Sequence, residues 1–200
     1  MRNSDAGFSL VDVIGALTVT TTVMVIAVPP MLNMVDQYRL GNSTRLVERE
    51  LQFAKLKAVS SDSPMRLRLN CPVAGQLRAV ELVGTPSVPD PLQDPDSYTD
   101  RCNDTIYPYR PTGADQSRLT KPNNDGPTRF VDSSVTMSAV SGTTNVQTVE
   151  FWADGSVHAN LNNTNPWTNI GGAGVTITLT RKGVTKTITV NGLGKILAQR

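Results

Sequence analysis

Few residues in this 200-residue chain have side chains that could catalyse a reaction or hold a metal. The chain has two cysteines, Cys71 and Cys102, and a single histidine, His158. Two thiols cannot complete a cysteine-rich zinc site, and one imidazole makes a mixed site a poor prospect. No motif supplies the partners of a hydrolytic triad around His158, and no glycine-rich phosphate loop stands between a strand and a helix. We therefore expect no enzyme activity, no metal and no cofactor, with His158 a surface or packed side chain.

The two cysteines are better suited to a structural role. In an oxidising compartment, a disulfide between Cys71 and Cys102 is the natural pairing. Closing a loop of roughly 30 residues would contribute about 3–4 kcal/mol by loop-closure entropy. Two free buried thiols are the alternative.

The amino-acid composition limits which kinds of fold can position these residues. Apolar residues make up 38% of the chain and aromatic residues 5%, which argues against a large enzyme core. Abundant Thr, Asn, Ser, Gly and Pro favour short strands and turns. The net charge of +2 is too small to indicate nucleic acid by itself, but its distribution is uneven. Acidic residues are dense between 86 and 132, and none follows Asp154.

The N-terminal segment has the composition of a membrane span. No charged residue occurs from Val13 to Val35. About 20 helical residues at 1.5 Å each cross a bilayer core of roughly 30 Å. The short polar leader carries Arg2, and a positive end retained in the cytoplasm directs the remainder outward. Asp12 is the exception, because a carboxylate inside an apolar helix costs about 2.5–3.5 kcal/mol and so needs a partner.

The segment Gly7–Ile14, GFSLVDVI, resembles the type III signal sequence of type IV pilins and type II secretion pseudopilins. The resemblance implies that prepilin peptidase cuts between Gly7 and Phe8 and methylates the new amino terminus of Phe8. It places Asp12 at the acidic fifth mature position, where the family usually has glutamate. The terminal ammonium and the Asp12 carboxylate are each costly in lipid, and pairing between neighbouring subunits would offset both costs.

Two prolines follow the apolar segment. Pro29 falls where pilins commonly have a helix-kinking proline, and the adjacent Pro30 departs from that pattern. Two alternatives to a pilin-type segment stay open. One is a secretory signal peptide cut after Ala27, which Asp12 and the sparse leader disfavour. The second is a plain signal anchor.

The remainder predicts a helix and then a β-rich head. Helix continues over Met31–Ser61, where Val47, Leu51, Ala54 and Ala58 recur at helical spacing. The strands that we predict are Met65–Leu69 with one face toward water, Gln76–Val83, Val146–Trp152, Val157–Leu161, and a closing three-strand antiparallel meander that starts at Val175, Val184 and Lys195.

The expected fold class is α+β, with a long N-terminal helix, transmembrane in its first half, packed on a small antiparallel sheet. The expected parts are a leader at 1–7, a transmembrane and assembly helix at 8–28, the periplasmic half of the helix at 29–61, and a head at 62–200. Within the head, residues 84–128 form an irregular insertion rich in Pro and Asp.

The second half of the chain resembles the FimT and GspH group of minor pilins and pseudopilins, in Leu51–Val59, Val149–Ser156 and Val190–Lys195. The resemblance implies a structural subunit that is incorporated into, or primes, a type IV pilus or a type II secretion pseudopilus. Its partners would be other pilins or pseudopilins, prepilin peptidase and the inner-membrane assembly platform. The protein would be a single-pass protein of the bacterial inner membrane with a periplasmic head, or part of an extracytoplasmic filament.

The same resemblance offers an alternative, because some FimT-like minor pilins bind DNA for uptake through a basic C-terminal region. Phosphate contact would require the basic side chains to converge on one face. If they do not converge, they are ordinary solubilising charges. The residues concerned are Arg181, Lys182, Lys186, Lys195 and Arg200.

Overall fold

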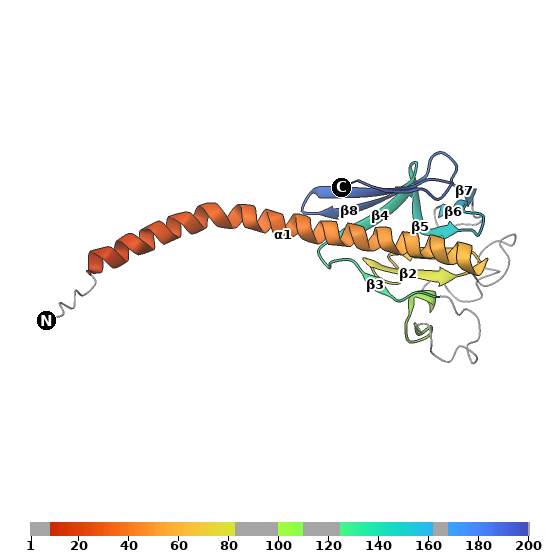
Figure 1. Cartoon of the computed structure of the whole chain (residues 1–200), viewed down its shortest axis with the longest axis horizontal. Coiled ribbons are helices and arrows are strands. Elements are labelled where there is room, and N and C mark those ends of the chain that lie inside the picture. The colour runs from red at the N-terminus through yellow and green to blue at the C-terminus, as the bar shows by residue number, and fades with distance from the viewer. Residues whose placement is uncertain (1–8, 83–99, 110–124, 162–167, 200) are drawn as a thin grey trace. The chain divides into compact units, whose positions relative to one another are not determined.

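The computed structural model describes residues 9–82, 100–109, 125–161 and 168–199 (Figure 1). The chain forms two compact units, one ending at Tyr38 and one beginning at Arg39. A single long helix, α1 (Leu10–Ser61), contributes to both units, and the strands all belong to the second.

The first unit consists of the N-terminal part of α1, whose side chains are almost all exposed. The hydroxyls of Thr18, Thr20, Thr21 and Thr22 each donate to the carbonyl four residues earlier, at 2.5–2.9 Å. The helix thereby satisfies its own polar side chains, which lets threonine stand in an apolar segment. The helix assignment continues without a break through positions 29 and 30, and the kink stays a prediction. Among the described residues, α1 is the helix long and apolar enough to cross a membrane.

The second unit is an antiparallel sheet with the remainder of α1 packed on it. The sheet order is β10-β9-β8-β4-β5-β1-β2-β3, while β6 pairs with β5 and β7 pairs with β6. All strand pairs among the described residues are antiparallel, which confirms the predicted α+β class. The strands are β1 (Met65–Leu69), β2 (Gln76–Glu81), β3 (Arg129–Phe130), β4 (Thr136–Ser141), β5 (Thr144–Phe151), β6 (Val157–Leu161), β7 (Thr168–Asn169), β8 (Val175–Arg181), β9 (Val184–Val190) and β10 (Ile196–Ala198). A short 3-10 helix, η1 (Asp100–Cys102), precedes β3.

The core lies between the second half of α1 and one face of the sheet. The four residues predicted from helical spacing, Val47, Leu51, Ala54 and Ala58, are all fully buried. They belong to one cluster with inward-facing side chains of the strands, such as Phe151. Since burial of each large apolar side chain contributes about 1.5–3 kcal/mol, this stripe fixes α1 on the sheet.

The expectation that β1 has one face toward water is wrong. All five residues of β1 are buried, including Arg66 at 2% exposure and Arg68 at 1%. Arg66 donates through Nε to Oε2 of Glu150 on β5, at 2.7 Å. Arg68 lies opposite Arg78 of β2 in the strand register. At β1 and β2, the second face of the sheet is therefore a buried polar layer, in which charged side chains meet partners from distant parts of the chain.

Three turns meet backbone to backbone at one end of the sheet. We call this contact the glycine junction; it comprises Gly155, Gly171, Gly192 and Gly194. The Gly192 N–H donates to Gly171 O at 3.0 Å, and the Val157 N–H donates to Gly192 O at 3.0 Å. A Cβ on Gly192 would stand 2.7 Å from Gly171 O, and one on Gly194 would stand 2.8 Å from Gly155 O. Glycine is required at these two positions because no space is left for a side chain.

We expect Gly192→Ala to destabilise the second unit, because the new methyl group would overlap the Gly171 backbone. Overpacking of this kind costs about 1–3 kcal/mol, and each kcal/mol lowers Tm by about 2–4 °C for a domain of this size. Thermal unfolding followed by circular dichroism measures the change. Gly172→Ala is the matched control, since a Cβ on Gly172 would meet nothing within 4 Å. Equal Tm values for the two variants would contradict the junction.

Candidate functional site

Asp12 lies in the first turn of α1 and caps it. Its Oδ2 accepts the Ser9 N–H at 3.2 Å, and the Ser9 Oγ accepts the Val11 N–H at 3.4 Å. This reciprocal arrangement is a variant of the capping box in which the hydroxyl accepts the second helical N–H, and the helix dipole favours a negative charge at this end. The pattern Ser-x-x-Asp was readable in the sequence, but sequence reasoning explained Asp12 only by a neighbouring subunit. Gly7 and Phe8, the predicted cleavage and methylation site, lie outside the described residues.

The first unit exposes many large apolar side chains. They include Leu10, Ile14, Leu17, Val25, Ile26 and Leu32, each more than half exposed. Soluble monomers rarely expose continuous apolar surface beyond a few hundred Å². No other described segment covers these side chains, which fits a membrane anchor.

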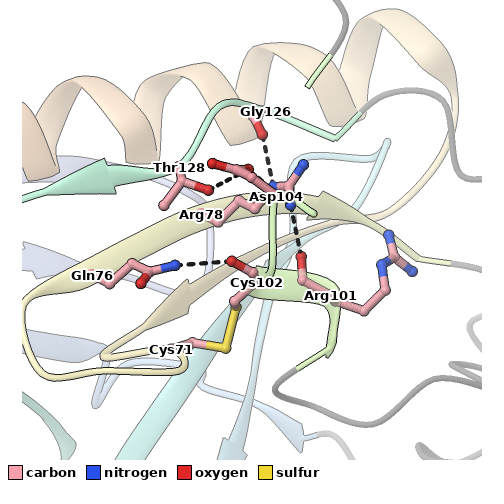
Figure 2. The surroundings of a disulfide bond; sticks show 8 residues. All are labelled: Cys71, Gln76, Arg78, Arg101, Cys102, Asp104, Gly126 and Thr128. Carbon is pink, nitrogen blue, oxygen red and sulfur yellow. Dashed lines mark hydrogen bonds and ion pairs between the residues drawn. A yellow bond between two sulfur atoms is a disulfide. The ribbon is translucent and has the colours of Figure 1, made fainter. Parts of the chain in front are cut away.

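Cys71 and Cys102 are disulfide-bonded, with their Cα atoms 5.7 Å apart and a sequence separation of 31 (Figure 2). The bond joins the turn after β1 to η1. The side chain of Gln76 donates through Nε2 to the carbonyl of Cys102 at 2.9 Å. The beginning of the described segment 100–109 is thus fastened to the β1–β2 hairpin, by a covalent bond to its turn and by a hydrogen bond from β2.

Arg78 of β2 fastens the same segment a second time (Figure 2). Its guanidinium is fully buried and donates to three backbone carbonyls: Nε to Gly126 at 2.8 Å, Nη1 to Arg101 at 3.2 Å, and Nη2 to Tyr107 at 2.6 Å. Asp104 approaches Nη1 at 3.3 Å. Burial lowers the pKa of Arg78, while the nearby carboxylates oppose that shift. A guanidinium suits this position because its five donors are held in a fixed planar fork.

Arg101 links the segment 100–109 to the end of β2 and to Asp125. Its Nη2 donates to the carbonyl of Glu81 at 2.9 Å and to Asp125 at 2.7 Å, and its guanidinium stands 5.0 Å from the centre of the Tyr107 ring. Burial raises the pKa of Asp125, and the charge of Arg101 opposes that rise. Buried charges placed in this way hold backbone in position. They anchor the described parts of the predicted insertion to the sheet, and the sequence carries no local signal for these contacts.

Arg181, one of the predicted DNA-contact residues, is engaged inside the head. It is 7% exposed and donates to Asp132 at 2.9 Å. Asp132 also lies 3.7 Å from Arg39 of α1, and its own N–H donates to the Ser43 hydroxyl at 3.1 Å. This carboxylate therefore ties the end of β8 to α1.

Two further basic residues of that set, Lys186 and Lys195, lie at different positions along α1. The Nζ of Lys186 lies 3.7 Å from where a Cβ on Gly41 would stand. Lys195 is exposed beside Gly194, whose carbonyl accepts the Nζ of Lys55 at 2.9 Å. Gly41 and Lys55 are about 21 Å apart along a helix, so the basic side chains do not converge at one point. Arg200 lies outside the described residues.

His158 packs against another aromatic side chain. Its ring stacks on Trp152 with centroids 4.2 Å apart. Burial lowers the pKa of His158, while the negative charges of Glu150 and Asp154 oppose that shift. Within the described residues, no group of three or more His, Cys, Asp or Glu side chains could hold a metal ion.

No family model and no curated protein sequence matches this chain. Several solved structures are similar to it. The type IV minor pilin FimU of Pseudomonas aeruginosa PAO1 is 13% identical, with a TM-score of 0.46 over 84% of this chain and 92% of that one. A second crystal form of FimU gives 13% and 0.44, over 80% and 92%. The minor pseudopilin EpsH of the type 2 secretion system of Vibrio cholerae is 12% identical, with a TM-score of 0.46 over 80% of this chain and 96% of that one.

These are the two kinds of protein that the sequence resemblance named. At such low identity, and with TM-scores below 0.5, the likeness assigns no function to this chain. Its function has to be argued from its own residues.

We expect Arg78→Met to destabilise the second unit strongly. Methionine fills similar space, but it would leave three backbone carbonyls without their donor and Asp104 without its cation. The expected loss is about 3 kcal/mol or more in the free energy of unfolding, measured in urea. Arg49→Met is the control, because the Arg49 side chain is 65% exposed. A loss no larger than that of the control would contradict the anchoring role of Arg78.

We expect Asp132→Asn to change the acid sensitivity of the protein. Hydrogen bonds from Ser134, and then the charges of Arg39 and Arg181, lower the pKa of Asp132. A carboxyl whose folded pKa is lowered stabilises the fold above its unfolded pKa of about 3.9, and this stabilisation is lost as pH falls through the folded value.

Urea unfolding should therefore show the asparagine variant less stable than the wild type near pH 6, with the difference shrinking toward about pH 2. Asp62→Asn, at an exposed position, controls for the general effect of acid. A difference that is constant with pH would contradict the charge-based account of Asp132.

Proposed function

We propose that this protein is a membrane-anchored minor pilin or pseudopilin, a subunit of a type IV pilus or of a type II secretion pseudopilus. Prepilin peptidase cuts between Gly7 and Phe8 and methylates Phe8. The observation that supports this proposal best is the combination at the start of α1: a capped, charged Asp12 heads a helix whose apolar surface the described chain leaves uncovered.

The apolar half of α1 fits two successive environments. Its length and composition suit a bilayer, and the same side chains can pack against the helices of sister subunits. Transfer from lipid to a filament keeps these side chains out of water, so assembly carries little hydrophobic cost. A subunit with this property works by assembling, and no catalytic group is needed.

Asp12 selects the register of that assembly. The capping bond occupies only part of the carboxylate, which has about four acceptor sites. The positive charge that pairs with the Asp12 carboxylate comes from the terminal ammonium of a neighbouring subunit, because lipid offers no counter-charge. At 4 Å and an effective dielectric constant of 20, such a pair is worth about 4 kcal/mol.

The head belongs on the oxidising side of the membrane. The head contains the Cys71–Cys102 disulfide. Disulfides persist in the oxidising periplasm and are rare in the cytoplasm. Arg2 in the leader gives the same orientation, with the N-terminus inside and the head outside. The protein is therefore a single-pass inner-membrane subunit until it enters a filament.

Substitution of Asp12 tests this function and separates its two roles. Asp12→Asn keeps an oxygen for the capping bond and removes the charge, whereas Ser9→Ala removes the capping hydroxyl and keeps the charge. Sheared filaments and membranes are assayed for the protein, and mass spectrometry gives the mature N-terminus. We expect a methylated Phe8 in the wild type, and at least a tenfold drop in filament incorporation for Asp12→Asn. For Ser9→Ala we expect nearly normal incorporation.

Two results would contradict the proposal. Undiminished incorporation of Asp12→Asn would show that Asp12 serves only as a helix cap. An intact Met1, or a chain that starts at Val28, would show that processing does not occur after Gly7.

A further inference from the structure

We propose that copies of this chain contact one another head to tail, with Leu193 of one copy packed into a pocket at the opposite end of the head of the next. We call the two surfaces the Leu193 turn, residues 191–195, and the Phe130 pocket, which lies between the β1–β2 turn and the β3–β4 connection. The inference rests on the proposed function and deepens it, because it names a contact that can repeat along a filament.

Leu193 is the most exposed large apolar side chain among the described residues, at 82%. It stands at the third position of the β-turn between β9 and β10, which the Gly194 N–H closes by donating to the Asn191 carbonyl at 2.9 Å. Such turn positions ordinarily hold Gly, Asn, Asp or Ser. Neither turn chemistry nor burial in the head therefore accounts for a leucine here.

The backbone on both sides of Leu193 is fixed. The Asn191 Oδ1 accepts the N–H of Leu193 at 3.1 Å and the N–H of Lys195 at 2.8 Å. The two flanking residues are the members of the glycine junction that leave no room for a Cβ, and Lys55 of α1 donates to the Gly194 carbonyl at 2.9 Å. An apolar side chain presented on a fixed backbone loses little conformational entropy on binding, which favours association.

The Phe130 pocket offers a matching apolar surface, with a volume of about 380 Å³. The side chains of Val131, Val135 and Met137 line it and are otherwise buried, whereas Phe130 is 61% exposed. Since a cavity of about 150 Å³ holds a benzene molecule, this pocket has room for a leucine side chain. Leucine packed there would remove apolar surface of both partners from water.

The Leu193 turn and the Phe130 pocket lie at opposite ends of the second unit. The pocket includes Asp132, whose N–H donates to the Ser43 hydroxyl of α1 at 3.1 Å, while the Leu193 turn meets α1 at Lys55. Ser43 and Lys55 are twelve residues apart, which is about 18 Å along a helix. Figure 1 shows this part of α1, in orange, running along the sheet, so a separation along the helix is a separation along the head.

The occupant of the pocket is a second copy of the chain, because the chain itself carries the complementary side chain at its other end. A contact between unlike ends leaves one pocket and one leucine free, so it extends into an open row of subunits, as a filament requires. One side chain in its pocket buries much less than the ~1,000 Å² of a stable interface. The contact therefore adds to the packing of anchored helices and does not hold free heads together.

Cysteine cross-linking between copies tests this inference. Both native cysteines are in the disulfide, so introduced cysteines are the free thiols. Full chains with Leu193→Cys and full chains with Phe130→Cys are produced together in cells, and sheared filaments and membranes are oxidised. We expect a covalent dimer between the two chains, and none from either chain alone. Leu197→Cys, at a leucine of β10 that is 54% exposed, is the matched control for Leu193→Cys and should lose the dimer.

Two further variants probe each side of the contact. Leu193→Ser should lower incorporation into filaments about tenfold, because it removes the apolar burial of one leucine, and should leave the Tm of the head unchanged. Ala74→Phe, at an exposed residue that lines the pocket, should lower incorporation similarly by filling it. Leu197→Ser is the control and should be incorporated normally.

The mixed dimer decides the inference. Its absence, or an equal yield with Leu197→Cys, would overturn the contact between copies. If Leu193→Ser lowered incorporation but no mixed dimer formed, the leucine would pack against a different subunit, and the second copy would be the wrong occupant. Incorporation and processing of the wild-type chain test the proposed function separately, since a wild type that enters no filament would contradict that function whatever the dimer shows.

Discussion

The first half of α1 presents an apolar surface that no other described part of the chain covers, and the rest of the molecule follows from that constraint. Water is an unfavourable solvent for such a surface, and its length and composition fit a membrane anchor. The second half of the same helix meets the opposite condition, since Val47, Leu51 and Ala54 are fully buried by the sheet. One continuous helix thus has a first half whose apolar side chains the described chain leaves exposed, and a second half whose apolar side chains the sheet buries.

In the second unit, side chains are buried on both faces of part of the sheet. One face takes the apolar stripe of α1, and the other carries the buried guanidinium groups of Arg66, Arg68 and Arg78. Burying a charge costs several kcal/mol unless hydrogen bonds and counter-charges replace water. Backbone carbonyls and carboxylates from distant segments do so here, which explains why an irregular, aspartate-rich segment accompanies a β-sheet head.

Most of the fold could be predicted from local periodicity in the sequence, whereas contacts between distant residues could not. The helical stripe at Val47–Ala58, the hairpin of β5 and β6, and the meander of β8 to β10 were predicted because each depends on a repeat within a few residues. β3 and β7 were missed, since two residues give no pattern, and β4 was missed as well.

The face of β1 was assigned to water because Arg alternating with Leu ordinarily means solvent. Its actual partner, Glu150, is 84 residues away in sequence. The cap at Asp12 was readable from Ser9, while the contacts of Arg78 had no local signal.

Mechanically, the glycine junction makes the head stiff: backbones that touch without side chains between them transmit a displacement instead of absorbing it. Lys55 links α1 to Gly194 of that junction. A pull along the second half of α1 would therefore be shared among three turns of the head.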